Sequence, residues 1–130
     1  MQYRLLETKI SKIDFVNELT QPGQVDLSAN YHTDVSVNAD DKRMILAEAQ
    51  FDMSGKQAAD DNSFLKIELN IAGVFEASEE VAEDSVDENV FHAMIFPYVR
   101  AYIATITALS GLSTITLPDM TAANKSEETK

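Results

Sequence analysis

The stretch Val25–Val37, VDLSANYHTDVSV, decides the fold. Its odd positions carry Val, Leu, Ala, Tyr, Thr, Val and Val, and its even positions carry Asp, Ser, Asn, His, Asp and Ser. Strict alternation with a period of two is typical of a β-strand that buries one face and exposes the other. The pattern therefore predicts a strand over residues 25–37 in a sheet with one buried and one solvated face.

Three further segments predict strands around this one. Residues 44–53 and 64–75 alternate in the same way, and residues 3–16 alternate less regularly. The apolar positions of the first segment change phase, beginning at Leu5, which indicates a bulge or bend. A similar change of phase after Gly73 indicates a bulge in the fourth segment.

Beyond residue 88 the apolar residues recur at gaps of three and four, which predicts an amphipathic helix that ends at Gly111. Ser85 and Glu88 have the S-x-x-E spacing of a capping box at its start. Pro97 lies inside the helix and is expected to kink it. The apolar positions are Val90, Phe91, Met94, Ile95, Tyr98, Val99, Tyr102, Ile103, Ile106 and Leu109.

Four strands followed by a helix indicate an α+β fold, in which a four-stranded antiparallel sheet carries the long helix on one face. The chain has 130 residues, which suits one domain, and we assign it to residues 1–120. Residues 121–130 have the composition of a disordered polar tail.

The predicted helix is too apolar to cover one sheet alone. Small residues off the main stripe let helices approach each other closely, which predicts packing against another chain's helix. The other interpretation is a monomer helix with more apolar surface than it needs. The residues off the stripe are Phe96, Ala101, Ala104 and Ala108.

The composition excludes several classes of protein. The chain has 22 acidic and 10 basic residues, a net charge of -12, which argues against binding nucleic acid or anionic lipid headgroups. It has no cysteine, hence no disulfide, catalytic thiol or Cys-based zinc site. The apolar window 90–109 includes His92, Pro97 and Arg100, which argues against a membrane span. With no secretory signal in residues 1–15, we expect a cytoplasmic protein.

No set of residues predicts catalysis, a metal or a cofactor. His32 and His92 are the only histidines, and both are expected to be solvated. The carboxylate pairs at 60–61 and 79–80 fall in polar runs and not in shielded pockets. No serine has the sequence context of a nucleophile. We therefore expect no enzyme activity and no cofactor.

The run Glu76–Glu88 carries seven acids and no base. It is either a solvated loop that precedes the helix or a docking patch for a basic partner segment.

Several motifs resemble those of the SecB-type export chaperones. Phe96–Arg100, FPYVR, resembles the F-P-Y-x-R that opens the long helix of this family. Gly111–Leu117, GLSTITL, is similar to the family's glycine turn and extended L-x-L segment. Gly73–Phe75 resembles the G-I-F that ends the fourth strand, and Phe15 resembles the phenylalanine near the end of the first.

This resemblance implies a protein that binds unfolded polypeptides without ATP and assembles as a homotetramer, a dimer of dimers. In the export branch it implies delivery to the SecA motor, and the alternative is a dedicated partner protein such as an antitoxin-guarding chaperone. The implied peptide-binding residues are Phe15, Val16, Leu19, Phe91, Phe96, Tyr98 and Tyr102. The expected acidic docking residues are Glu68, which matches a family acid, and Glu76, Glu79 and Glu80, which belong to the acidic run. The expected oligomer interface is formed by the small residues of the helix, Ala101, Ala104 and Ala108.

The chain also departs from the family pattern. Two acidic positions near the end of the family's first strand, which help to dock SecA, correspond to Lys12 and Val16, whereas Glu68 matches the acid of the fourth strand. Ser113 stands where the family has a proline. The family's second helix is missing, because residues 120–130 are too few and too polar to form it. Peptide holding is therefore better supported than SecA docking.

Overall fold

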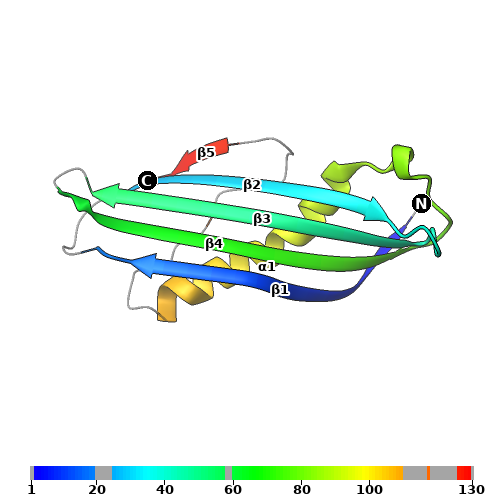
Figure 1. Ribbon diagram of the computed structural model, residues 1–130, viewed down its shortest axis with the longest axis horizontal. Coiled ribbons are helices and arrows are strands. Elements are labelled where there is room, and N and C mark those ends of the chain that lie inside the picture. Colours follow the sequence, from blue (N-terminus) through cyan, green and yellow to red (C-terminus); the bar gives the residue numbers. More distant parts are fainter. Residues whose placement is uncertain (1, 20–24, 58–59, 110–116, 118–125, 130) are drawn as a thin grey trace.

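The computed structural model describes residues 2–19, 25–57, 60–109, 117 and 126–129. One long sheet lies in front of a single helix that crosses it diagonally (Figure 1). In chain order the elements are β1 (Tyr3–Asn17), β2 (Asp26–Val37), β3 (Met44–Gln57), β4 (Asp60–Ala77), a 3₁₀ turn η1 (Glu83–Ser85), α1 (Glu88–Leu109) and β5 (Ser126–Thr129).

The sheet has the order β1-β4-β3-β2-β5, and every pair of neighbouring strands is antiparallel. The α+β class is thus confirmed, with four long antiparallel strands followed by a long helix. β5 is an additional edge strand that pairs with Leu27–Asn30 of β2. The disordered tail expected over 121–130 is therefore corrected at residues 126–129, and the rest of that segment lies outside the described residues.

The register places two bulges in β1, and the β3–β4 pair has a further shift between Lys56 and Gln57. The pairing of β1 with β4 shifts between Leu5 and Glu7 and again between Ile10 and Lys12, which confirms the irregularity expected there. The bulge expected in β4 after Gly73 is wrong, because the β3–β4 register passes that residue without a shift. An ideal Cβ on Gly73 would come within 3.2 Å of the Cδ1 atom of Ile95, so this glycine lets the helix approach the sheet.

The helix begins at Glu88, and the capping box expected from Ser85 does not form. Instead the Asp87 carboxylate accepts a hydrogen bond of 3.0 Å from the amide of Asn89, which makes Asp87 the N-cap. The Ser85 hydroxyl donates to the carbonyl oxygen of Ala82 at 2.8 Å, within η1. Pro97 lies inside a continuous helix, and the expected stop at Gly111 lies outside the described residues.

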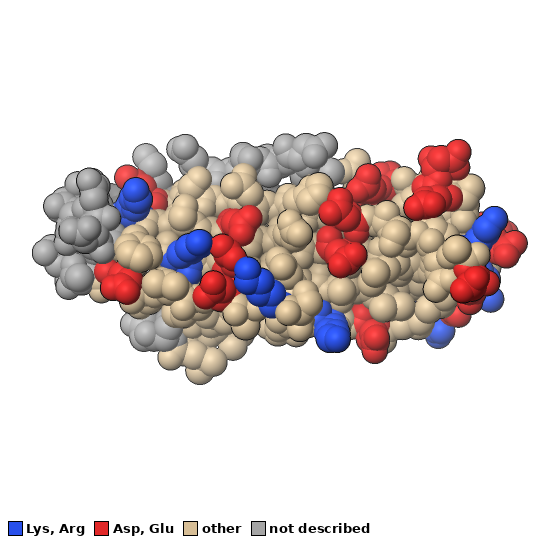
Figure 2. Space-filling model, viewed as in Figure 1, with Lys and Arg blue, Asp and Glu red and all other residues tan. Residues whose placement is uncertain are grey.

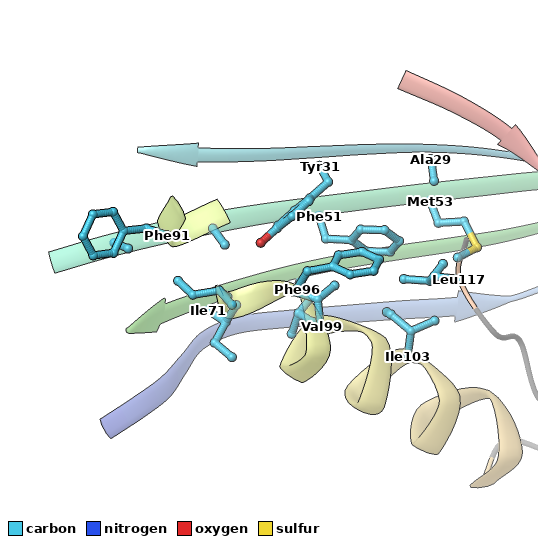
Figure 3. Packing of buried hydrophobic residues seen from close by; sticks show 14 of the residues in the cluster. Ala29, Tyr31, Phe51, Met53, Ile71, Phe91, Phe96, Val99, Ile103 and Leu117 are labelled. Carbon is cyan, nitrogen blue, oxygen red and sulfur yellow. The ribbon is translucent and has the colours of Figure 1, made fainter. Parts of the chain in front are cut away.

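The core fills the space between the sheet and α1. The ring of Phe91 makes edge contacts with Tyr3 of β1 and Phe75 of β4, with ring centroids 4.7 and 5.1 Å apart. Phe96 lies farther along the helix among Tyr31, Phe51 and Val99 (Figure 3). Each such apolar side chain contributes roughly 1.5–3 kcal/mol on burial.

One residue of the extended segment after the helix is described. Leu117 is buried in the same core, on the side where Ile103 and Met53 lie (Figure 3). The segment that resembles the family's L-x-L therefore returns its last leucine to the core.

The buried face of α1 is rotated from the stripe that periodicity predicts. Phe96, expected to face another chain, is buried against the sheet, whereas Tyr98 and Leu109 are 39% and 83% exposed. The correction for Phe96 has a physical reason, since the aromatic ring of Tyr31 lies 5.5 Å from it. The buried positions are Phe91, His92, Ile95, Phe96, Val99, Ile103 and Thr107.

Candidate functional site

The outward face of α1 exposes apolar side chains and carries little charge. Tyr98 and Leu109 are exposed large hydrophobic residues, and Tyr102 between them is half-buried. From residue 89 to residue 109 the helix carries a single charge, that of Arg100. In the view of Figure 1 the last turn of the helix projects beyond β1, which explains the exposure of Leu109.

Arg100 lies at the border between this outward face and the core. Its guanidinium carbon is 4.9 Å from the centre of the Phe96 ring, a cation–π distance. Its Nε atom is buried, and among the described residues it finds no hydrogen-bond acceptor. Buried donors in folded proteins nearly always have a hydrogen-bond acceptor. The unpaired Nε of Arg100 therefore marks the adjoining surface as a candidate contact site.

The residues assigned to peptide binding do not form one surface. Phe91 and Phe96 belong to the core, so the folded chain does not offer them to a client. Phe15 faces the helix side of the sheet, opposite Ile67, whereas Val16 follows it onto the other face, opposite Lys66.

The residues that keep partial exposure on the helix side are Phe15, Leu19, Tyr98 and Tyr102. Sequence reasoning missed Ile13, which is 47% exposed and lies two residues before Phe15, hence on the same face of β1. The alternation within β1 was the available signal, but it predicts burial and not exposure. Ile13 remains open because the helix packs against β2, β3 and β4 more closely than against β1.

The opposite face of the sheet carries charge in both signs (Figure 2). Asp14, Glu68 and Asp52 lie side by side across β1, β4 and β3. Glu68 accepts hydrogen bonds of 3.1 Å from Lys12 and from Lys66. Both lysines lower the pKa of the Glu68 carboxyl, and in return Glu68 raises the pKa of Lys12.

The four acidic docking residues therefore divide into two groups. Glu68 and Glu76 are ion-paired, the latter with Arg4 at 2.9 Å and with Arg43 at 3.9 Å. Glu79 and Glu80 are exposed in the loop after β4. The sequence predicted docking roles for all four, but two of them, Glu68 and Glu76, are ion-paired within the chain.

The two histidines occupy opposite environments. His32 is exposed, as expected, with its Nε2 atom 3.0 Å from the Asp34 carboxylate. His92, expected in solvent, is buried, and its ring stacks on Tyr31 with centroids 3.9 Å apart. Its Nδ1 atom lies 2.8 Å from the Thr33 hydroxyl, which provides a polar partner inside the core.

Tyr31 completes this buried polar group. Its hydroxyl donates a 2.7 Å hydrogen bond to the carbonyl oxygen of His92. Burial raises the pKa of Tyr31 to about 12, although a hydrogen bond with Thr33 acts in the opposite direction. The fold thus stabilises the protonated, neutral form of the Tyr31 phenol.

Ala101 and Ala108 are exposed and Ala104 is half-buried, so the three alanines lie on or beside the outward face of α1. Within the described residues, no cluster of three or more His, Cys, Asp or Glu side chains could hold a metal ion. In the same part of the chain, no helix has both the length and the hydropathy needed to cross a bilayer.

No protein-family model matches the sequence, and a search of curated proteins finds no match. Among solved structures, the fold is similar to a Mycobacterium tuberculosis SecB-like chaperone, Rv1957, in complex with a ChAD peptide from the Rv1956 HigA1 antitoxin. The TM-score is 0.74 at 10% sequence identity, and the match covers 91% of this chain and 90% of that one. The protein therefore has a SecB-like fold.

Proposed function

We propose that this protein is an ATP-independent chaperone that holds unfolded or non-native polypeptides. The observation that carries the proposal is the outward face of α1, where Tyr98 and Leu109 are exposed on a stretch with one charge in 21 residues, 89–109. An apolar surface of this kind on a chain with net charge -12 combines client binding with solubility. Each client side chain that it buries adds roughly 1.5–3 kcal/mol.

β1 supplies the second part of the proposed binding surface. Ile13 and Phe15 share the helix side of the sheet, and both keep solvent exposure. An extended client segment that contacts both Ile13 and the end of α1 would bury apolar area without requiring a defined sequence. Tyr98 and Tyr102 add rings whose hydroxyl groups tolerate contact with water.

Assembly is part of the proposal. The small side chains Ala101, Ala104 and Ala108 allow close approach of a second helix, and the buried Nε of Arg100 would gain an acceptor there. We propose a homo-oligomer, with a dimer of dimers as its full form, in the cytoplasm. Light scattering of the purified protein should give the mass of a dimer or tetramer, and the mass of a monomer would contradict the assembly.

The chaperone activity is tested with a chemically denatured model protein. The wild type at near-equal molar ratio should suppress light scattering by the client without ATP. The variant Leu109→Asp should lose most of this suppression and keep its free energy of unfolding, because Leu109 is 83% exposed. Ala39→Asp is the matched control, since it adds the same charge at an exposed position in the connection between β2 and β3, outside the proposed binding surface. Unchanged client scattering with the wild type would refute the proposal.

A second candidate is a dedicated partner-binding protein, such as an antitoxin-guarding chaperone. Two observations favour it: the similar solved structure contains an antitoxin peptide, and Glu68 is held by Lys12 and Lys66. Ion pairing of Glu68 also weakens the case for delivery of preproteins to SecA. A pulldown that recovers one stoichiometric partner would support this candidate, whereas many unrelated clients would support a general holding activity.

A further inference from the structure

The free edge of β2 is only partly covered. β5 pairs with Leu27–Asn30, in the register Ser28 opposite Glu128 and Ala29 opposite Glu127. In the described part of the chain no strand pairs with residues 31–37 on that side. An edge of this kind presents unpaired amide and carbonyl groups, and an extended polypeptide can add to it as a further strand.

β5, which occupies part of the β2 edge, is expected to bind there weakly. β5 has four residues, SEET, and neither serine nor glutamate favours strands. Its two carboxylates are among the 22 acids of a chain with a net charge of -12. A strand of four residues forms few backbone hydrogen bonds. Its negative charges are also repelled by the net negative charge of the protein, so a competing strand can replace it.

The open part of the edge favours a basic competitor. A hollow of about 390 Å³ lies between this part of β2 and the start of α1. It is lined by three carboxylates together with His32, Thr33, Val86 and Asn89. The carboxylates are those of Asp34, Asp87 and Glu88. A lysine or arginine side chain from an added strand would find opposite charge there.

We propose that the β2 edge is a strand-addition site for extended, basic segments of client polypeptides, and that β5 is its displaceable internal occupant. The inference rests on the proposed chaperone function and adds a mode and a chemical class of client segment to it. Backbone hydrogen bonds along β2 would give affinity without sequence specificity, and the acidic hollow would select for basic residues.

A disulfide lock tests the site. Ser28→Cys with Glu128→Cys places the only two cysteines of the chain at directly opposed positions. The Cα separation of such a pair suits a disulfide. The probe is a peptide of alternating valine and lysine, as long as residues 27–37, and its affinity is measured by fluorescence anisotropy. The oxidised variant should bind this peptide about tenfold more weakly than the reduced one, because the lock removes the open state of the edge.

Three controls accompany the test. A chain that lacks residues 126–130 should bind the peptide more tightly than the full chain, and the Ser28→Cys single variant should not respond to oxidation. An alternating valine–glutamate peptide should bind more weakly than the basic one. Equal affinity of the oxidised and reduced forms, failure of the disulfide to form, or equal binding of the two peptides would overturn the inference.

The same preparations separate this inference from the proposed function. If the protein suppresses aggregation of a denatured client but the lock does not change peptide binding, the strand-addition site alone is refuted. If no preparation suppresses aggregation, the proposed chaperone function fails, whatever the peptide result.

Discussion

The imidazole of His92 stacks on the phenol ring of Tyr31 at 3.9 Å, and the Tyr31 hydroxyl donates a hydrogen bond to the carbonyl oxygen of the same histidine. These residues are 61 positions apart in the sequence. The pair joins β2 to the first turns of α1, so it fixes the rotation of the helix on the sheet. That rotation decides which side chains of α1 remain outside.

Removal of the Tyr31 hydroxyl should destabilise the fold. Tyr31→Phe keeps the ring stack and deletes one buried donor, so we expect a loss of about 1 kcal/mol in the free energy of unfolding. Urea titration at neutral pH measures the effect. Tyr98→Phe, at a ring that is 39% exposed, is the control and should change little. Equal effects of the two substitutions would argue against the buried hydrogen bond.

Alkaline pH should weaken the protein through the same phenol. The folded-state pKa of Tyr31 is about 12, above the ordinary value of 10.0, so the unfolded chain loses this proton first. The stabilisation is complete below the ordinary pKa and is lost as pH rises from there through the folded-state pKa. Near pH 11 the loss should be about 1.4 kcal/mol. Urea midpoints of the wild type should therefore fall between about pH 9 and pH 11 more than those of Tyr31→Phe.

The ion cluster around Glu68 should affect stability in acid. Hydrogen bonds from Lys12 and Lys66 lower the pKa of Glu68, so its contribution is present above the ordinary carboxyl pKa and is lost as pH falls through the folded-state pKa. Lys12→Met should raise the pKa of Glu68 in an NMR titration of the side-chain carboxyl. Lys9→Met, opposite Ala72 on the same face, should leave it unchanged. High salt should reduce the difference between the variants.

An added methyl group at Gly73 should strain the contact between sheet and helix. The new Cβ would lie 3.0 Å from the Cε1 atom of Phe75 and 3.2 Å from the Cδ1 atom of Ile95, and both side chains are fully buried. Overpacking of this kind costs about 1–3 kcal/mol. Chemical denaturation of Gly73→Ala measures the cost. Ile95→Val in the same chain should recover part of it, and strictly additive losses would count against the clash.

The two faces of α1 should respond differently to truncation. Phe96→Ala removes a buried ring and should cost about 3–5 kcal/mol of unfolding free energy. Leu109→Ala removes a side chain that is 83% exposed and should change stability by less than about 0.5 kcal/mol. Thermal and urea unfolding, read at one protein concentration, test the contrast. Comparable losses would mean that Leu109 is buried in solution, for example by a second copy.

Local periodicity predicted the elements well. Alternation in Val25–Val37 and its neighbours predicts strands because a pleated backbone directs successive side chains to opposite faces, and all four long strands form. The change of phase in β1 correctly indicated bulges, since an inserted residue shifts the pattern. The same reasoning was wrong at Gly73, where the missing side chain reflects the approach of Ile95 and not a bulge.

The candidate site was predicted less well, because exposure depends on packing between distant segments. Phe96 and Tyr98 are both aromatic and only two residues apart, yet Tyr31 of β2 packs against Phe96, whereas Tyr98 stays 39% exposed. Likewise, Lys12 and Glu68 become partners only when β1 pairs with β4.

The sequence alone determined the class of the fold, the four long strands and the helix, because residues a few positions apart set these periodicities. Only the tertiary structure decided how α1 is rotated, that His92 lies in the core, and that Ser126–Thr129 occupies part of the β2 edge. Each of these outcomes depends on contacts between segments far apart in the chain, and no local pattern of residues specifies them.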